Sequence, residues 1–199
     1  IRLVAAWSRS KESVMKFARE FNILAYHDLS LMVEENEIDI VIVCTPHPFH
    51  VQPCVEAAGS GANVLVEKPL ASSLEDCDTM IHSCKENNVK LGVISQRRWY
   101  EPAKRVKNAI DEGKIGEPVL GTINMLGWRD KSYYDADEWR GTWDLEGGGV
   151  LVNQAPHQLD LFLWYMGEID EVVAAWGNLN HPYIKVEDTA LAIVRFKNG

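Results

Sequence analysis

The chain has 199 residues, of which 46% are hydrophobic and 25% are charged, and its formal net charge is −9. This length allows one large or two small globular domains. The acidic balance disfavours nucleic acid or an anionic membrane as the main partner. No apolar run approaches the ~20 residues that a membrane-spanning helix requires. The four cysteines lack CxxC spacing and are too few for a disulfide scaffold, so we expect reduced thiols and a cytoplasmic location.

Strand-like and helix-like segments alternate regularly up to Gly92. Strands are predicted over residues 3–7, 38–44, 63–66 and 90–94. Helices are predicted over residues 11–21, 29–35, 48–58 and from a serine cap at 72 or 73 to residue 87. The apolar run 38–44 is typical of a strand buried on both faces. This alternation predicts parallel β-α-β units with right-handed crossovers.

The pattern changes after Pro102, where a helix to Glu112 leads into a glycine-containing loop over 113–118. Longer, alternating strands are predicted over 119–128, 171–178 and 188–196, with a helix between Val150 and Met166. We expect a parallel-sheet domain over residues 1–116 and an α+β domain with a largely antiparallel sheet over 117–199. The chain begins inside a strand-like run and ends on an Asn198-Gly199 hairpin turn. Both ends are therefore expected to be cut.

The segment Cys44 to His50 follows the second apolar strand and opens a helix. Backbone amides at a helix N-terminus attract phosphate, and Thr45 adds a hydroxyl. An ordinary strand-to-helix turn explains the same residues equally well. A metal site is a weaker alternative, because prolines separate its candidate ligands. Those candidates are Cys44, His47, His50 and Cys54.

Ser8 and Arg9 follow the first predicted strand. In a dinucleotide fold, a carboxylate at the end of the second strand binds the ribose hydroxyls, whereas an arginine accommodates a 2′-phosphate. Neither Ser8 nor Arg9 is acidic, so this position favours NADP over NAD. A helix cap followed by a solvated cation is the structural alternative.

The strand over 63–66 is followed directly by Glu67, Lys68 and Pro69. This order places an amine at the carboxyl end of a buried strand, where open α/β sheets bind their ligands. A crowded lysine can donate a hydrogen bond to a reacting oxygen. A salt bridge from Glu67 to a cation on a helix is the alternative, which we favour less.

Three consecutive glycines begin the segment from Gly147 to Asp160. A helix that continues through Pro156 would bring Asn153, His157 and Asp160 to one face, but Pro156 either kinks that helix or begins it. A histidine beside a carboxylate suits general acid–base chemistry. Taken alone, this motif is better explained by a core histidine paired with Asp160.

Trp139 and Arg140 lie in a loop rich in aromatic residues, just after Tyr133 and Tyr134. An arginine among rings could hold a cofactor or a sugar by forked hydrogen bonds and stacking. The same loop could equally serve domain packing.

Taken together and in order, these motifs resemble the Gfo/Idh/MocA family of sugar and inositol dehydrogenases. The matching segments are Thr45-Pro46 with His50, Glu67 to Ala71, Gln96 to Arg98, Trp139 to Trp143, and Gly147 to Asp160. The resemblance implies a Rossmann domain followed by an α/β domain with a large open sheet. It also implies NAD(P)-dependent hydride transfer to or from a secondary alcohol of a sugar or cyclitol.

The resemblance, together with the motifs considered above, gives expected roles to individual positions. Lys68 lies near the nicotinamide, and His157 is the proton carrier. The residues expected along the cofactor are Ser8, Arg9, Thr45, Pro46, His50, Glu67, Lys68, Gln96, Trp139 and Arg140. The residues expected to orient substrate hydroxyls are Arg98, Asn153 and Asp160. No metal is expected.

The chain also departs from the family pattern. The first Rossmann strand, its GxGxxG turn and about a third of the C-terminal sheet are not found in it. Many members carry aspartate where this chain has Asn153, so His157 is expected to act with Lys68 alone. Two alternatives remain open, namely a glycosidase that uses NAD as a bound redox relay and a non-catalytic regulator that senses a sugar or nucleotide. By analogy, a homodimer or homotetramer is expected.

Overall fold

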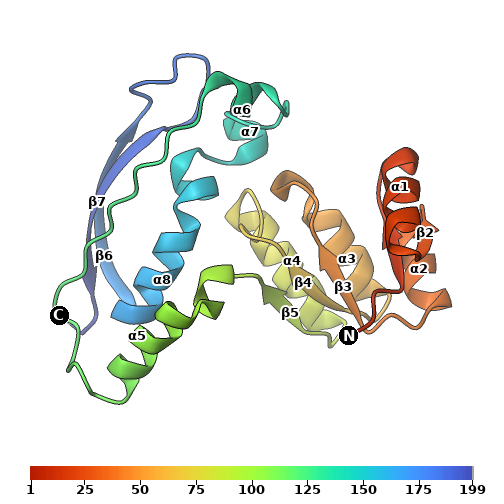
Figure 1. Ribbon diagram of the computed structural model, residues 1–199, viewed down its shortest axis with the longest axis horizontal. Coiled ribbons are helices and arrows are strands. Elements are labelled where there is room, and N and C mark those ends of the chain that lie inside the picture. Colours follow the sequence, from red (N-terminus) through yellow and green to blue (C-terminus); the bar gives the residue numbers. More distant parts are fainter. Residues whose placement is uncertain (199) are drawn as a thin grey trace. The chain divides into compact units, whose positions relative to one another are not determined.

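The computed structural model describes residues 1–198 and divides into two compact units, Ile1–Ile94 and Ser95–Gly199 (Figure 1). This division lies upstream of the boundary expected at Gly116. The reason is that the helix after Pro102 packs within the second unit, where the Tyr165 hydroxyl donates to the main-chain oxygen of Ala103 at 3.1 Å. Within residues 1–198, no helix has the length and apolar character needed to cross a membrane.

The N-terminal unit alternates short strands with helices, as predicted. Its strands are β1 (Ala5–Trp7), β2 (Leu24–Tyr26), β3 (Ile40–Val43), β4 (Asn63–Val66) and β5 (Leu91–Val93). Its helices are α1 (Lys11–Phe21), α2 (Leu29–Glu35), the 3-10 turn η1 (His47–Phe49), α3 (Val51–Gly59) and α4 (Leu74–Glu86). Side-chain oxygens of Ser10, Asp28 and Ser73 cap α1, α2 and α4, because each satisfies an amide that the first helical turn leaves without a partner.

All strand pairs of this unit are parallel. β1 pairs with β2, and β3, β4 and β5 form a three-stranded sheet in that order. The parallel pairing confirms the Rossmann-type prediction. Sequence reasoning missed β2, because three residues are too few to show an alternating pattern.

The prediction that residues 38–44 are buried on both faces is wrong. Val41 and Val43 are buried, whereas Ile40 and Ile42 are 49% and 53% exposed. Val41 and Val43 share a core with Leu29 of α2 and with residues of α3. An apolar run therefore identified the strand correctly, but helices of this unit cover only the face that carries the valines.

The C-terminal unit combines helices with one antiparallel hairpin. Its helical elements are η2 (Gln96–Trp99), α5 (Glu101–Asp111), α6 (Lys131–Asp135), α7 (Trp143–Glu146), the π-helix η3 (Val150–Gln154) and α8 (Pro156–Met166). Its strands are β6 (Ile169–Gly177) and β7 (Thr189–Phe196), which pair antiparallel (Figure 1). Pro156 begins α8, where its missing amide proton costs nothing.

The predicted strand over 119–128 is also wrong, because the structure assigns no strand or helix to this segment. An alternating pattern becomes a strand only when a neighbouring chain supplies the hydrogen-bonding ladder. Instead, a Cβ at Gly121 would overlap the Phe162 ring of α8, so the segment touches that helix. Gly199, the second residue of the predicted hairpin turn, lies outside the described residues.

Candidate functional site

His50 joins the turn after β3 to the loop after β4. Its side chain is 1% exposed. The Nε2 atom lies 2.8 Å from the main-chain oxygen of Thr45, and Nδ1 lies 3.1 Å from the oxygens of Pro69 and Leu70. Buried polar atoms are stable only with such partners. His50 therefore positions the loop that carries Lys68, and its ring nitrogens face main-chain oxygens.

The Glu67–Pro69 loop begins where β4 ends, as the sequence suggested. The Glu67 amide donates to the main-chain oxygen of Val43 at 3.0 Å, and the Lys68 amide donates to Glu67 Oε2 at 3.2 Å. Desolvation of the sulfur, followed by the charge of Glu67, raises the pKa of the Cys44 thiol, although the residue as a whole is exposed. The structure thus places Glu67 and Lys68 directly after the carboxyl end of β4, the middle strand of the three-stranded sheet.

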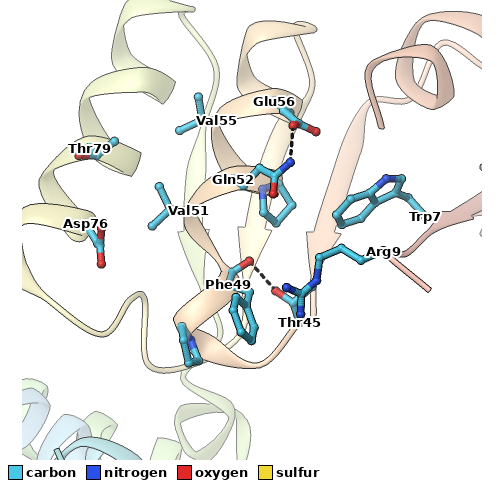
Figure 2. A pocket seen from close by; sticks show the side chains of 12 residues that line it. Trp7, Arg9, Thr45, Phe49, Val51, Gln52, Val55, Glu56, Asp76 and Thr79 are labelled. Atoms are coloured by element: carbon cyan, nitrogen blue, oxygen red, sulfur yellow. Dashed lines mark hydrogen bonds between the residues drawn. The ribbon is translucent and has the colours of Figure 1, made fainter. Parts of the chain in front are cut away.

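A cavity of about 560 Å³ lies beside the turn after β3 (Figure 2). The guanidinium carbon of Arg9 sits 3.9 Å from the centre of the Phe49 ring. The Thr45 hydroxyl donates to the main-chain oxygen of Phe49 at 3.0 Å. The lining also includes Trp7 and the carboxylates of Glu56 and Asp76.

The lining of this cavity combines aromatic, cationic and acidic side chains. The volume of the cavity is within the range of small-molecule sites. The rings of Trp7 and Phe49 in its lining are suited to stacking on a flat ligand. The Arg9 guanidinium, at the edge of this cavity, could pair with an anionic oxygen. Ser8 has a local role, since its hydroxyl accepts a hydrogen bond from the Ser10 amide at 3.2 Å.

Three of the four residues considered for a metal site, Cys44, His50 and Cys54, differ from one another in exposure and in contacts. Cys54 is fully buried, and its sulfur lies 3.9 Å from that of Cys84. Cys44 is exposed, and the ring nitrogens of His50 face main-chain oxygens. Among the described residues, no group of three or more histidine, cysteine, aspartate or glutamate side chains could hold a metal ion.

Glu187 organises the glycine-rich segment of the C-terminal unit. Its two carboxylate oxygens each accept from the Gly149 amide at 2.9 Å, and Oε1 accepts from the Leu151 amide at 3.0 Å. A Cβ at Gly149 would overlap the main-chain oxygen of Glu187. Glycine is therefore required at 149 for close approach of two backbones. No local pattern in the sequence indicates that Glu187 is the partner.

Glu146 is a second buried carboxylate that sequence reasoning missed. It is 2% exposed and accepts hydrogen bonds from the Gly141 amide at 2.5 Å and from Asn153 Nδ2 at 2.7 Å. Burial raises its pKa, while these two hydrogen bonds and the charge of Arg140 act in the opposite direction. The available signal was its place at the end of α7, directly before three glycines.

Tyr133, Trp139 and Arg140 join the same cluster. The Tyr133 hydroxyl accepts from the side-chain amides of Asn153 and Gln154 at 3.2 and 3.1 Å. The Arg140 guanidinium lies 4.1 Å from the centre of the Tyr133 ring and 4.7 Å from that of Trp139. The structure therefore brings the predicted Trp139-Arg140 pair together with Asn153 through Tyr133.

Arg98 and Asp160 form a forked ion pair. Arg98 Nε and Nη2 lie 2.8 and 2.7 Å from the two oxygens of Asp160, and this hydrogen bonding raises the pKa of Arg98. The pair ties η2 to α8. His157 is half-buried in the first turn of α8, one turn before Asp160. Gln96 lies exposed at the start of η2.

Comparisons with known proteins agree with these features. Residues 1–95 match the profile "Oxidoreductase family, NAD-binding Rossmann fold", and residues 103–199 match the profile of the GFO/IDH/MocA C-terminal domain. A 1-carboxy-3-chloro-3,4-dihydroxycyclohexa-1,5-diene dehydrogenase from Comamonas testosteroni is 32% identical, over 100% of this chain and 50% of that protein. A myo-inositol 2-dehydrogenase from Thermotoga maritima is 31% identical, over 88% of this chain and 51% of that protein.

Among solved structures, the WlbA dehydrogenase from Bordetella pertussis in complex with NADH and UDP-GlcNAcA is similar. It is 33% identical, with a TM-score of 0.91, over 100% of this chain and 61% of that protein. The chain thus spans between half and two thirds of the length of these relatives. The two profiles together account for nearly the whole sequence, so the chain belongs to the GFO/IDH/MocA family of oxidoreductases, whose N-terminal domain is an NAD-binding Rossmann fold.

Proposed function

We propose that the protein transfers a hydride between a nicotinamide cofactor and a secondary alcohol of a sugar or cyclitol. The observation that carries this proposal is the two-domain family match. The similar proteins named above act on a cyclic diol and on myo-inositol, or bind NADH with a nucleotide sugar. The lysine that follows β4, Lys68, supports the same chemistry.

In this proposal, Lys68 and His157 divide the proton work. The cofactor, when bound, accepts or supplies the hydride. His157 takes the proton of the reacting hydroxyl, because an imidazole can exchange a proton near neutral pH. Lys68 donates a hydrogen bond to the oxygen as negative charge develops, a contribution of about 3 kcal/mol to lowering the barrier. Asn153, Arg98 and Asp160 orient the remaining substrate hydroxyls.

The turnover test is Lys68→Ala. We expect it to retain cofactor binding, measured by nicotinamide fluorescence, and to lose about 100-fold or more in kcat, measured at 340 nm with a panel of sugars and cyclitols. Lys90→Ala is the matched control, because Lys90 is an exposed lysine just before β5. Near-normal turnover in the Lys68 variant would refute its role. Product formed without net change at 340 nm would identify a redox relay instead.

For the cofactor, we propose that Arg9 favours NADP. Its guanidinium is held against the Phe49 ring at the edge of the cavity, where it can pair with a 2′-phosphate. Arg9→Ala should weaken NADP binding about tenfold or more and leave NAD binding within about twofold. Arg19→Ala, at an exposed position on α1, is the control. An equal loss for both cofactors would contradict the preference.

For assembly, we propose pairing of two copies through one face of the β6–β7 hairpin. Val173, Leu191 and Ile193 share that face and are 64%, 74% and 74% exposed, and exposed apolar patches mark interaction sites. An Arg195–Glu171 ion pair of 3.1 Å borders the patch. Leu191→Glu should convert the dimer to a monomer in light scattering. A monomeric wild-type protein would contradict this proposal.

A further inference from the structure

Asn153 and Glu146 are held together inside the C-terminal unit, in the cluster that leads to α8. Glu146 ends α7, and Asn153 lies in η3, four residues before His157. Building on the proposed function, we propose that Glu146 is a positioning residue of the hydride-transfer reaction, because its carboxylate fixes which atom of the Asn153 amide meets a substrate hydroxyl.

The first step of the argument is the direction of the hydrogen bonds. An amide group offers two N–H donors on nitrogen and acceptor sites on oxygen. Asn153 Nδ2 lies 2.7 Å from Glu146 Oε1 and 3.2 Å from the Tyr133 hydroxyl. The side-chain nitrogen of Asn153 therefore faces Glu146 and Tyr133, and its side-chain oxygen points the other way. In this orientation the side-chain oxygen of Asn153 would accept a hydrogen bond from a substrate hydroxyl.

The second step is the charge of Glu146. An ionised carboxylate only accepts hydrogen bonds, so it holds the amide by its nitrogen. A protonated carboxyl can donate to the amide oxygen, and the amide could then turn to present its nitrogen. The polarity that Asn153 shows to a substrate thus depends on whether Glu146 is ionised.

The charged and titratable groups around Glu146 act in both directions. Burial and the charge of Glu187 raise its pKa, whereas the Gly141 amide, the Asn153 amide and Arg140 lower it. Burial and the charge of Glu146 also raise the pKa of Tyr134, to about 12, so Tyr134 stays protonated at neutral pH. The Arg140 guanidinium lies 4.1 Å from the centre of the Tyr133 ring. The pKa of Glu146 is thus set by opposing effects, of which burial is the largest.

The third step is that Asn153 and Glu146 form a matched pair. An aspartate at 153 would place two carboxylates at the distance now spanned by a hydrogen bond, and such a pair must share one proton. An exchange of the two groups, with a glutamine at 146 and an aspartate at 153, would restore one carboxylate and one amide. In the exchanged pair the aspartate accepts from the glutamine amide with one oxygen and offers the other to the substrate.

The test compares Glu146→Gln, Asn153→Asp and the double variant. Each single substitution should lower kcat/KM about tenfold to a hundredfold, the range for losing a hydrogen bond to a charged group. Asn153→Asp should also move the acid limb of the pH–rate profile to higher pH. The double variant should recover to within about tenfold of wild type, because the donor–acceptor pattern is restored. Glu138→Gln, an exposed acid in the same loop, is the control and should leave kcat/KM unchanged.

Independent losses in the double variant, equal to the sum of the single effects on a logarithmic scale, would overturn the proposal. Thermal unfolding separates this result from misfolding, since a purely structural role would lower the midpoint temperature without moving the pH profile. A wild-type protein that binds cofactor but turns over no sugar or cyclitol would instead refute the proposed function. In that case the side-chain amide resonances of Asn153, followed by NMR across pH, still report on the pair. A shift that persists in Glu146→Gln would show that Glu146 does not control the amide.

Discussion

The two units hold their candidate site residues by different chemistry. In the N-terminal unit, main-chain carbonyls on the ring of His50 secure the loop that carries Lys68. In the C-terminal unit, buried carboxylates of Glu146 and Glu187 secure the segment that leads to His157. Carbonyls keep one charge state, whereas carboxylates gain protons in acid. The comparison predicts that pH acts on the C-terminal unit through its carboxylates, and that acid loosens this unit where the folded pKa of a carboxyl is depressed, as it is at Asp188.

Gly149→Ala is the strongest challenge to the carboxylate-held side. The new methyl group would overlap the main-chain oxygen of Glu187. Moving either backbone would break the hydrogen bonds from the Gly149 and Leu151 amides to the Glu187 carboxylate. We expect a loss of about 3 kcal/mol in the free energy of unfolding, measured in urea. Gly59→Ala is the control, because a Cβ there meets no atom within 4 Å. Equal stability of the two variants would show that the backbones of Gly149 and Glu187 are not tightly packed.

His50→Ala probes the carbonyl-held side. It leaves the main-chain oxygens of Thr45, Pro69 and Leu70 without the ring that now faces them. The expected loss in the free energy of unfolding is about 2 kcal/mol. His82→Ala, on the exposed face of α4, should change stability little. An unchanged melting temperature for His50→Ala would mean that the loop is secured in another way.

Asp188→Asn tests the acid sensitivity directly. Burial alone would raise the pKa of Asp188, but hydrogen bonds from the amides of Leu179 and Asn180 and from His181 hold it well below its usual 3.8. Because the folded pKa is depressed, this stabilisation is present above about pH 3.8 and is lost as pH falls through the folded value. The variant should lose about 1 kcal/mol at neutral pH.

The decisive measurement for Asp188→Asn is urea unfolding from pH 3 to 7. The difference in unfolding free energy between wild type and variant should shrink toward the acid end. Asp144→Asn, at an exposed position on α7, is the control and should run parallel to wild type. A constant difference across this range would contradict the linkage.

Phe49→Leu sharpens the comparison with the smallest effect. Arg9 is held by an aromatic face and not by a carboxylate, so its contribution should vary little with pH. Losing a cation–π contact of about 0.5–1 kcal/mol should weaken NADP binding about twofold to fivefold. Phe17→Leu, a ring on α1, is the control. A larger loss with the control than with Phe49→Leu would remove the ring from the argument.

Local signals in the sequence were sufficient for much of the fold. Ser10 and the spacing of apolar residues located α1 at 11–21, and the run 63–66 located β4 with its bounds. Each of these signals is contained in a short stretch of sequence, so no contact with a distant residue is needed to recognise it. The order of motifs likewise indicated the family, since each motif is contiguous in the chain.

Contacts between distant residues decided the rest. Residues 119–128 have the alternation of a strand, but the segment packs at Gly121 against α8 and gains no ladder. Glu187 lies far along the chain from the glycines that it holds, and Glu146 becomes meaningful only when folding places it on Asn153. The sequence by itself located helices α1 to α5 and the parallel strands other than the three-residue β2. Only the tertiary structure decided which carboxylates are buried and paired, because desolvation and hydrogen bonding depend on neighbours that local patterns do not encode.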